Sequence, residues 1–585
     1  MPTIIRSGQL CTAGKKNILS GVRNILSSIF YANSTKKGAC LISLDFYKAY
    51  DRVLISFLIV VMKHMGFGDT FCAWVQMLHT DAETTFMLSR LSESIPISFS
   101  IRQGDPFAML LYIIYAEPLL TLIESGINGM MVKSIQQSLE AYCDDLNVIT
   151  EDINDLIKVD EMVTMFESVS GAILSRDKKC KVLVFGLWKN KNTWPLNYLQ
   201  TVKEVKIFGI FVMNSYRSLL KRNWDYRFKK FEDAILSWSL RSLETLFQRV
   251  EVVKTFALSR VIYVASVLPL SKTMSRKFEK VIGKFLWNFS GKVLRVPINE
   301  LKLSRLKGGL GLTCICSAAK SLKVSQILKL LQSGDLKSIK HIDFWIGEVL
   351  QDLDQDLGLM GNTLQVPSFF EELALLITDA KISNTIDAHN WRSLSNRSIY
   401  LSYMSELPPP RVEIESGFSL VDIWKRINLP CLDSQEREVM YLLAHNKIPV
   451  PERLFRIHLA NDPYCMTCLD YEGANICDLE HFFCSCRRIS ESWSLIASIV
   501  LKFLPNVSSS SNLNFDLISL RFDRNLYENE IVWLISSYVS EIWRIFNRRN
   551  EQNVQKEKLF GFLKYKYRKN QMGARLKLQE IQDLI

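Results

Sequence analysis

Two adjacent carboxylates, Asp144 and Asp145, follow Tyr142 and Cys143 within the mainly apolar segment LEAYCDDLNVIT. Because the flanking residues favour extended backbone, the acid pair is expected at the tight turn of a β-hairpin. An isolated Asp-Asp pair is usually an ordinary turn without a function. The pair therefore needs a partner elsewhere in the sequence before it indicates chemistry.

A third carboxylate, far upstream, supplies that partner. The segment LISLDFYKAYDRV (residues 41–53) begins like a strand, places Asp45 at the end of that strand and then changes to helical spacing. Two Mg2+ ions about 3.5 to 4 Å apart need carboxylate ligands, with one ion beside the attacking oxygen and one beside the leaving group. Asp45, Asp144 and Asp145 together predict such a two-metal site for phosphoryl transfer.

A second group of residues suited to bind metal lies near the C-terminus. Its spacing is Cys-x2-Cys followed by His-x4-Cys, formed by Cys465, Cys468, His481 and Cys486. Thiolate and imidazole at these separations predict one structural Zn2+ in a closed tetrahedral site. Cys477 and Cys484 are rival ligands, and reduced core cysteines are the alternative explanation.

Composition restricts the class of protein. The 585 residues exceed what one core normally supports, so several domains are expected. Apolar residues make up 48% of the chain and charged residues 23%, which excludes wholesale disorder. The run LLYIIYAEPLL is interrupted by Glu117 and Pro118, so no membrane span is expected. Without a secretory signal at its N-terminus, the chain is expected inside the cell, with its 13 cysteines as thiols or metal ligands.

The net charge of +12 is concentrated in one region. Residues 217–307 contain 20 Lys or Arg against 7 Asp or Glu, with helical periodicity and interleaved aromatic residues. This combination predicts contact with a nucleic-acid backbone. The alternative is a helical region with a solvated basic face.

Three short motifs follow one another in an order and at a spacing that identify a family. They are DFYKAYD (45–51), RQGDPFA (102–108) and YCDD (142–145). With these motifs the chain resembles the reverse transcriptases of non-LTR (LINE-type) retrotransposons, whose blocks read LDFxKAFD, RQGxPxS and YxDD. Viral RNA-dependent RNA polymerases usually carry Gly before the acid pair, so Tyr142 and Cys143 speak against that class.

The resemblance implies roles for residues around the acidic motif. The three carboxylates would bind two catalytic Mg2+ ions, which Mn2+ can replace, and the main-chain carbonyl of Phe46 would be a further metal ligand. Tyr50 matches the aromatic residue that packs under the sugar and excludes a 2′-hydroxyl. That steric exclusion distinguishes a DNA polymerase from an RNA polymerase.

The resemblance also assigns residues around the substrate. Gln103 and Gly104 would border the incoming nucleotide, and Arg102 belongs to the same substrate-binding group. Lys178 would lie near the triphosphate and protonate the leaving pyrophosphate. Its alternative explanation is membership of an ordinary basic cluster with Lys179 and Lys181. The sequence departs from the family at Ala108 and Ser175, where relatives usually have Ser and Asn.

The predicted fold class is α+β, with a right-hand polymerase palm built on a ferredoxin-like antiparallel sheet. The expected segments are truncated fingers and palm (1–200), a basic helical thumb (201–312), a helical linker region (313–460), a zinc-binding module (461–495) and a basic helical tail (496–585). Relatives carry an endonuclease domain and more of the fingers ahead of this point, so we expect a truncated copy.

The function implied by the resemblance is RNA-directed DNA synthesis during retrotransposition. The partners would be an RNA template, a DNA primer or target, and dNTP substrates, without a membrane and with the oligomeric state left open. The expected location is the nucleus, together with a cytoplasmic ribonucleoprotein. The alternative is a catalytically inactive remnant that only binds nucleic acid.

Overall fold

The structure is a computed structural model, and the residues that it describes form two compact units. It describes residues 8–11, 17–87, 89–97, 100–102, 104–177, 180–287, 296–405, 407–408, 419–468, 475–504, 513–523, 526–547 and 556–572. Unit 1 comprises residues 1–227, 262–271 and 317–402, and unit 2 comprises residues 228–261, 272–316 and 403–585. This grouping follows contacts between residues, so the five functional segments expected from the sequence stay a prediction.

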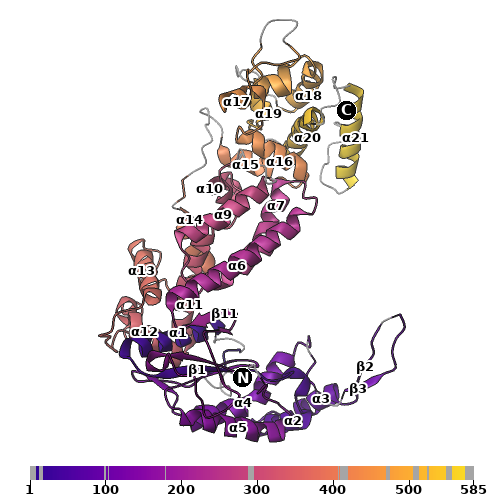
Figure 1. The fold of residues 1–585 in the computed structure, drawn as a ribbon. Coiled ribbons are helices and arrows are strands. Elements are labelled where there is room, and N and C mark those ends of the chain that lie inside the picture. Colours follow the sequence, from indigo (N-terminus) through magenta and orange to yellow (C-terminus); the bar gives the residue numbers. More distant parts are fainter. Residues whose placement is uncertain are drawn as a thin grey trace. The chain divides into compact units, whose positions relative to one another are not determined.

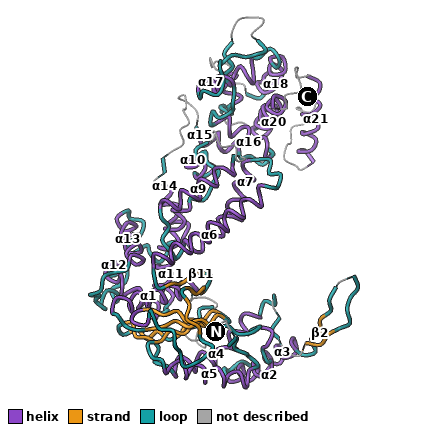
Figure 2. The backbone as a smooth tube through the Cα atoms, viewed as in Figure 1, coloured by secondary structure: helices purple, strands orange, loops and turns teal. Residues whose placement is uncertain are grey.

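Unit 1 contains all the strands of the described residues (Figures 1 and 2). Its elements are α1 (Ile18–Thr35), β1 (Ala39–Leu44), η1 (Tyr50–Arg52), α2 (Ile55–His64), α3 (Asp69–His79), β2 (Ala82–Thr84), β3 (Ile95–Ile97), α4 (Ala108–Gly126), β4 (Met130–Val132), β5 (Ile135–Gln137), β6 (Leu139–Tyr142), β7 (Asp145–Thr150), α5 (Asn154–Ser170), β8 (Lys181–Phe185), η2 (Gly186–Trp188), β9 (Gln200–Val202), β10 (Glu204–Ile207), β11 (Ile210–Met213), α12 (Leu336–Leu350) and α13 (Ser368–Ile382).

Unit 2 is helical in the residues that the structure describes. Its elements are α7 (Leu246–Val252), η3 (Val253–Leu258), α9 (Lys272–Leu286), α10 (Ile298–Lys302), η4 (Arg305–Lys307), α15 (Leu420–Ile427), α16 (Ser434–Ala444), α17 (Pro451–Arg456), η5 (His481–Ser485), α18 (Ser490–Lys502), α19 (Leu513–Ile518), α20 (Glu528–Asn547) and α21 (Lys556–Met572). Four further helices contribute residues to both units: α6 (Tyr216–Ser239), α8 (Ser259–Ala265), α11 (Ile315–Ser333) and α14 (Asn396–Ser405).

A five-stranded sheet in the order β6-β7-β1-β8-β9 forms the centre of unit 1. The pairs from β6 to β8 are antiparallel and β8 pairs with β9 in parallel. Alternate residues of β1 (Cys40, Ile42 and Leu44) are buried in one core with side chains of α4 and α5. Those two helices lie on one face of the sheet and α1 lies on the other (Figure 1). The predicted α+β fold with an antiparallel palm sheet is confirmed.

Helix α4 corrects the expectation that no segment could span a membrane. Ala108–Gly126 is long and apolar enough to do so by length and composition, in spite of Glu117 and Pro118. Most of the apolar window, 61%, is buried inside the structure. The helix is apolar because it packs between the sheet and its neighbouring helices in the core of unit 1.

The chain after Asp45 also differs from the prediction. The helical spacing of residues 45–53 yields only the short 3-10 helix η1, and Lys48 has a left-handed φ of 45°. The backbone stays extended through Phe46, which bridges to Leu174, and the Tyr47 amide donates to the Ile173 carbonyl at 2.8 Å. This pairing with a distant segment overrides the local helical pattern.

A buried polar network joins α12 to the sheet. Glu140 on β6 is fully buried and accepts hydrogen bonds from Asn24 at 2.9 Å and Gln137 at 3.0 Å, and it forms an ion pair with Lys337 at 2.9 Å. His341 contacts Ser27 through Nδ1 at 2.9 Å and Gln137 through Nε2 at 3.1 Å. The expected helical linker region therefore includes a helix fixed to the strand that leads to the acid pair.

Replacing Lys337 is expected to destabilise unit 1. In Lys337→Met the buried carboxylate of Glu140 would lose its ion-pair partner, and breaking a buried pair in this way costs about 3 to 5 kcal/mol. The midpoint of thermal unfolding should fall in Lys337→Met and stay unchanged in Lys340→Met, since Lys340 is exposed on the same helix. Equal midpoints for the two variants would contradict this role of the ion pair.

Candidate active site

The acid pair lies at the tip of the hairpin formed by β6 and β7. Tyr142 pairs with Asp145 across the two strands, so Cys143 and Asp144 form the turn. Cys143 has a φ of 53°, which is the left-handed region that a two-residue turn can require. Both aspartates are exposed. The hairpin predicted from LEAYCDDLNVIT is present, with its acids accessible to solvent.

Asp45 is brought to this hairpin by the neighbouring strand. Leu44, the last residue of β1, pairs with Leu146 of β7, so the next position of β1 lies beside Asp145. The Asp45 carbonyl accepts a hydrogen bond from the Ser175 amide at 2.8 Å, which holds the end of the strand. The two acidic motifs, far apart in the sequence, therefore meet at one end of adjacent strands.

The electrostatics of the three carboxylates show that they influence one another. Although Asp144 is exposed, the protein around it removes part of its solvation, which raises its pKa above the ordinary value, and the charge of Asp45 adds to the increase. Burial also raises the pKa of Asp145, with further increases from Asp144 and Asp45. Like charges held close together disfavour ionisation, and a divalent cation between them would relieve that repulsion. The donor set of hard carboxylate oxygens fits Mg2+ or Mn2+.

Lys206 is a residue at this site that the sequence did not single out. It lies on β10, and its positive charge partly offsets the increase in the pKa of Asp145 that burial and the neighbouring carboxylates cause. Its ammonium group lies 5.8 Å from the centre of the Phe211 ring and 5.6 Å from that of Tyr226. The available signal was the alternation in VKIFGIFV, which leaves this lysine exposed between two buried residues.

Tyr50 lies next to the acid hairpin, where the resemblance placed the residue that contacts the sugar. Its ring stacks on Tyr112 of α4, with ring centres 4.5 Å apart and planes inclined by 24°. Burial raises the pKa of Tyr50, as do its contact with Cys143 and the charge of Asp144. The phenol is therefore a neutral, supported wall beside the carboxylates.

Removing the Tyr50 ring is expected to admit ribonucleotides. In Tyr50→Val the bulk that would meet a 2′-hydroxyl is lost, and discrimination against an added hydroxyl by shape alone is worth up to about 10²-fold. The ratio of rNTP to dNTP incorporation should rise in this variant and stay unchanged in Tyr47→Val, because Tyr47 is exposed. An unchanged ratio in Tyr50→Val would mean that another residue excludes the hydroxyl.

The second motif is positioned ahead of α4. Gly104 has a φ of 94°, and a Cβ added there would meet nothing within 4 Å, so the glycine is required for its backbone conformation and leaves open space. Arg102 is exposed and donates to the Leu78 carbonyl at 3.3 Å. Gln103 and Lys178 lie outside the described residues. The substrate roles of all four, and that of the Phe46 carbonyl, stay predictions.

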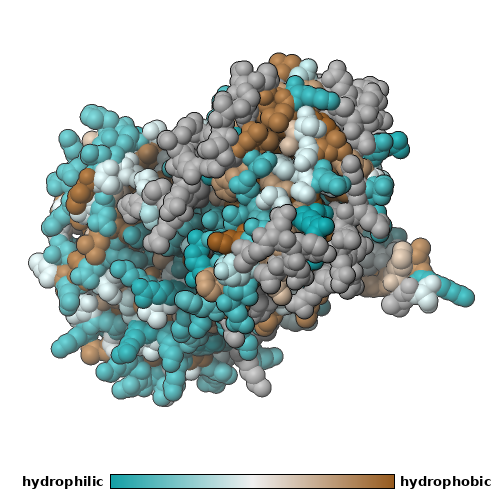
Figure 3. Space-filling view, turned by 90° about the horizontal axis from the view of Figure 1, so that it is seen from above, coloured by the Kyte–Doolittle hydropathy of each residue, from teal (hydrophilic) through white to brown (hydrophobic). Residues whose placement is uncertain are grey.

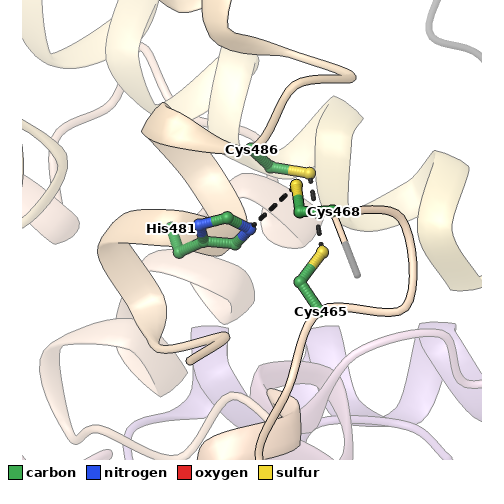
Figure 4. A group of neighbouring side chains, drawn as sticks. All are labelled: Cys465, Cys468, His481 and Cys486. Atoms are coloured by element: carbon green, nitrogen blue, oxygen red, sulfur yellow. Dashed lines mark hydrogen bonds between the residues drawn. The ribbon is translucent and has the colours of Figure 1, made fainter. Parts of the chain in front are cut away.

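The four predicted zinc ligands converge in unit 2 (Figure 4). Their ligand atoms all lie within 4.8 Å of one another. The Sγ atoms of Cys465 and Cys486 are 3.8 Å apart, and Cys468 Sγ is 3.6 Å from His481 Nε2. A tetrahedron with Zn–S of about 2.3 Å and Zn–N of about 2.0 to 2.1 Å has edges of about 3.8 Å and 3.6 Å. These two distances match the edges of such a tetrahedron, so the group could hold one Zn2+.

The local structure distinguishes these ligands from the rival cysteines. Cys465 is buried, which disfavours ionisation, but hydrogen bonds from the Thr467 backbone and the His481 ring bring the pKa of its thiol down to about 6. Burial raises the pKa values of Cys477 and Cys484 above their ordinary range, and also that of the predicted ligand Cys486, so the rivals differ from Cys486 in position and not in acidity. Cys484 lies in the π-helical η5, is buried, and is not a member of the group of four. Thiolate character is thus favoured at Cys465.

The basic region between residues 217 and 307 forms exposed helical faces. On α6 the exposed basic residues are Arg217, Lys221, Arg222, Lys229 and Lys230, and on α9 they are Lys272, Arg276, Lys277, Lys280 and Lys284. Much of the coloured face seen in Figure 3 is likewise hydrophilic. These exposed faces are compatible with the predicted contact to nucleic acid and with a solvated basic surface, so the contact stays a prediction.

Comparisons with known proteins point to one family. Residues 9–212 match the family model described as reverse transcriptase (RNA-dependent DNA polymerase). The chain is 25% identical over 341 residues to the transposon TX1 uncharacterized 149 kDa protein of Xenopus laevis, a match that covers 56% of this chain and 25% of that protein. The matched part of the chain thus corresponds to about a quarter of the relative's length.

A solved structure of telomerase from Candida albicans, in complex with a TWJ fragment of telomeric RNA, is also similar. The match has a TM-score of 0.25 and 12% identity, and it covers 60% of this chain and 53% of that one. At that TM-score the likeness carries no argument about this chain. The family match over residues 9–212, by contrast, contains all three carboxylates and Tyr50.

Proposed function

We propose that the chain is an RNA-directed DNA polymerase of the non-LTR retrotransposon type, because residues 9–212 match the reverse transcriptase family model and the chain is similar to a transposon protein. It would add dNTPs to the 3′-hydroxyl of a DNA primer paired with an RNA template. The observation that carries the proposal is the convergence of Asp45, Asp144 and Asp145 at one end of β1 and the β6–β7 hairpin.

The residues of the chain would divide the reaction between them. The three carboxylates would hold two divalent cations, which when bound stabilise charge on the attacking and leaving oxygens. Tyr50 would lie against the sugar and select deoxyribonucleotides by bulk. Gly104 would let the backbone approach the incoming nucleotide, and Arg102 would lie beside it. Lys178 would donate a proton to the leaving pyrophosphate.

An active polymerase accounts better for these features than an inactive remnant does. A chain that only bound nucleic acid would have no use for three mutually repelling carboxylates, since their negative charge opposes binding of a phosphate backbone. Nor would it need an aromatic ring stacked beside them. The preserved carboxylates and Tyr50 therefore support catalysis.

We further propose that unit 2 binds one structural Zn2+ on Cys465, Cys468, His481 and Cys486, and that the basic faces of α6 and α9 contact the template and primer. The interatomic distances within the group of four support the first proposal. The second is supported by the exposed lysines and arginines, which can neutralise phosphates. Both proposals can be tested by binding measurements, without measuring DNA synthesis.

Primer extension with the purified chain tests the proposed function. A labelled DNA primer on an RNA template, supplied with dNTPs and Mg2+, should be extended, and rNTPs in place of dNTPs should give little product. Binding of the same primer–template is measured in parallel by gel shift. A chain that binds the primer–template but extends it with neither Mg2+ nor Mn2+ would be the inactive remnant, and the proposal would be wrong.

A further inference from the structure

A pair of thiols lies directly beside the acid hairpin. The N-terminal segment pairs in parallel with β6: Gln9 bridges to Ala141, the Leu10 amide donates to the Ala141 carbonyl at 2.8 Å, and the Ala141 amide donates to the Gly8 carbonyl at 2.8 Å. Two residues further along both segments, Cys11 meets Cys143. Their Sγ atoms are 3.2 Å apart.

The backbone around the two cysteines is held by a single side chain. Oε1 of Gln9 accepts a hydrogen bond from the Cys11 amide at 3.1 Å and another from the Cys143 amide at 3.3 Å. Neighbouring strands lie about 4.7 to 4.9 Å apart, which is within the Cα separation of about 4.4 to 6.8 Å that a disulfide spans. The pairing of the two segments therefore predicts a backbone spacing that a disulfide can span.

We propose that Cys11 and Cys143 are a reversible oxidation site, converted to a disulfide by hydrogen peroxide. Its existence is independent of the proposed polymerase function, and only its effect on catalysis rests on that function. Cys11 is 3% exposed and Cys143 is 8% exposed, so the pair suits an oxidant little larger than water. Larger disulfide reagents would be excluded by the same burial.

The reaction is a two-electron oxidation of the two thiols. The Cys11 thiolate attacks one oxygen of peroxide, the O–O bond breaks, and hydroxide leaves to give a sulfenic acid on Cys11. The Cys143 sulfur then attacks the Cys11 sulfur, and water leaves as the S–S bond forms and the Cys143 proton is lost. In sum, two thiols and one peroxide give one disulfide and two waters.

The environment assigns the first step to Cys11. The hydrogen bond from Cys143 lowers the pKa of the Cys11 thiol to about 7, even though burial acts in the opposite direction. A thiolate is the nucleophile in thiol oxidation, so Cys11 reacts first and Cys143 resolves the sulfenic acid.

Oxidation would act on the catalytic hairpin because Cys143 immediately precedes Asp144. The sulfur atoms must approach from 3.2 Å to the disulfide length of about 2.05 Å, a contraction of about 1 Å that the turn must absorb. Catalytic groups need positions accurate to about 0.5 Å, and a misplacement of about 1 Å can cost on the order of 10²-fold in rate. The oxidised chain should therefore be a much slower polymerase.

The experiment treats the purified, zinc-loaded chain with hydrogen peroxide and maps its peptides by mass spectrometry without reduction. A cross-linked peptide containing Cys11 and Cys143 is expected in wild type, and dithiothreitol should remove it. The matched control is Cys72→Ser, since Cys72 is another buried cysteine of unit 1 and its loss should leave the cross-link intact. Absence of the cross-linked peptide, or sulfinic acid in its place, would overturn the proposal even if the chain polymerises well.

Activity and zinc content are measured on the same samples. Wild type and Cys72→Ser should lose DNA synthesis on the order of 10²-fold after peroxide and recover it with dithiothreitol, whereas Cys11→Ser should change little. The thiolates of unit 2 also react with peroxide, so the zinc content is the control. It should stay constant in the samples that lose DNA synthesis. Inactivation of Cys11→Ser to the same extent as wild type would overturn the effect on catalysis. If the untreated chain makes no DNA, the proposed function fails while the peptide map still tests the oxidation site.

Discussion

Asp144→Asn is expected to slow DNA synthesis on the order of 10³-fold or more, because the transition state loses several kcal/mol of stabilisation. Asparagine keeps the shape of the side chain but removes a negative charge that two divalent cations need. The turn residue is exposed, so the substitution should leave the β6–β7 hairpin folded. The measurement is single-turnover primer extension on an RNA template.

Two comparisons make the result specific. Asp69→Asn changes an exposed acid at the start of α3 and should keep the wild-type rate. Binding of the primer–template, measured by gel shift, should be unchanged in Asp144→Asn, because the lost charge opposes phosphate binding instead of supporting it. A wild-type rate in Asp144→Asn would rule out Asp144 as a metal ligand.

Cys486→Ser is expected to lose the zinc of unit 2. The hydroxyl is a poor substitute for a thiolate, and a structural zinc site contributes its binding free energy to folding, so the surrounding chain should loosen as well. Zinc per chain should fall from one towards zero, and protease cleavage after about residue 460 should increase. DNA synthesis on a short primer–template should survive, because the zinc ligands and the acid hairpin belong to different units.

Cys484→Ser is the matched control for the zinc site. Cys484 is only two residues away and equally buried, but it is not a member of the group of four. Elemental analysis should find one zinc per chain in this variant. Zinc lost from Cys484→Ser and kept in Cys486→Ser would reverse the ligand assignment. If the wild-type chain contained no zinc, the proposed zinc site would be wrong.

Local sequence patterns predicted the elements whose causes are local. The extended residues around the acid pair predicted the β6–β7 hairpin. The three carboxylates could be grouped because each is next to a recognisable strand or turn. The spacing of the four zinc ligands likewise carried enough information to predict their convergence.

Features created by contacts between distant segments could not be predicted in this way. The bridge between Phe46 and Leu174 keeps the backbone extended where the local pattern indicated a helix. The ion pair of Lys337 with Glu140 depends on how α12 packs against β6, which no periodicity within either segment reveals. The same is true of Lys206, whose effect on Asp145 arises from the placement of a separate hairpin.

The central claim is that the three carboxylates form a two-metal site, and counting bound metal tests it most directly. The chain is assembled with an RNA template, a dideoxy-terminated DNA primer and the next dNTP, and bound Mn2+ is measured by electron paramagnetic resonance. The account predicts two Mn2+ more per complex in wild type than in a variant carrying Asp45→Asn and Asp144→Asn together. The same number of bound Mn2+ in wild type and in that variant would contradict it.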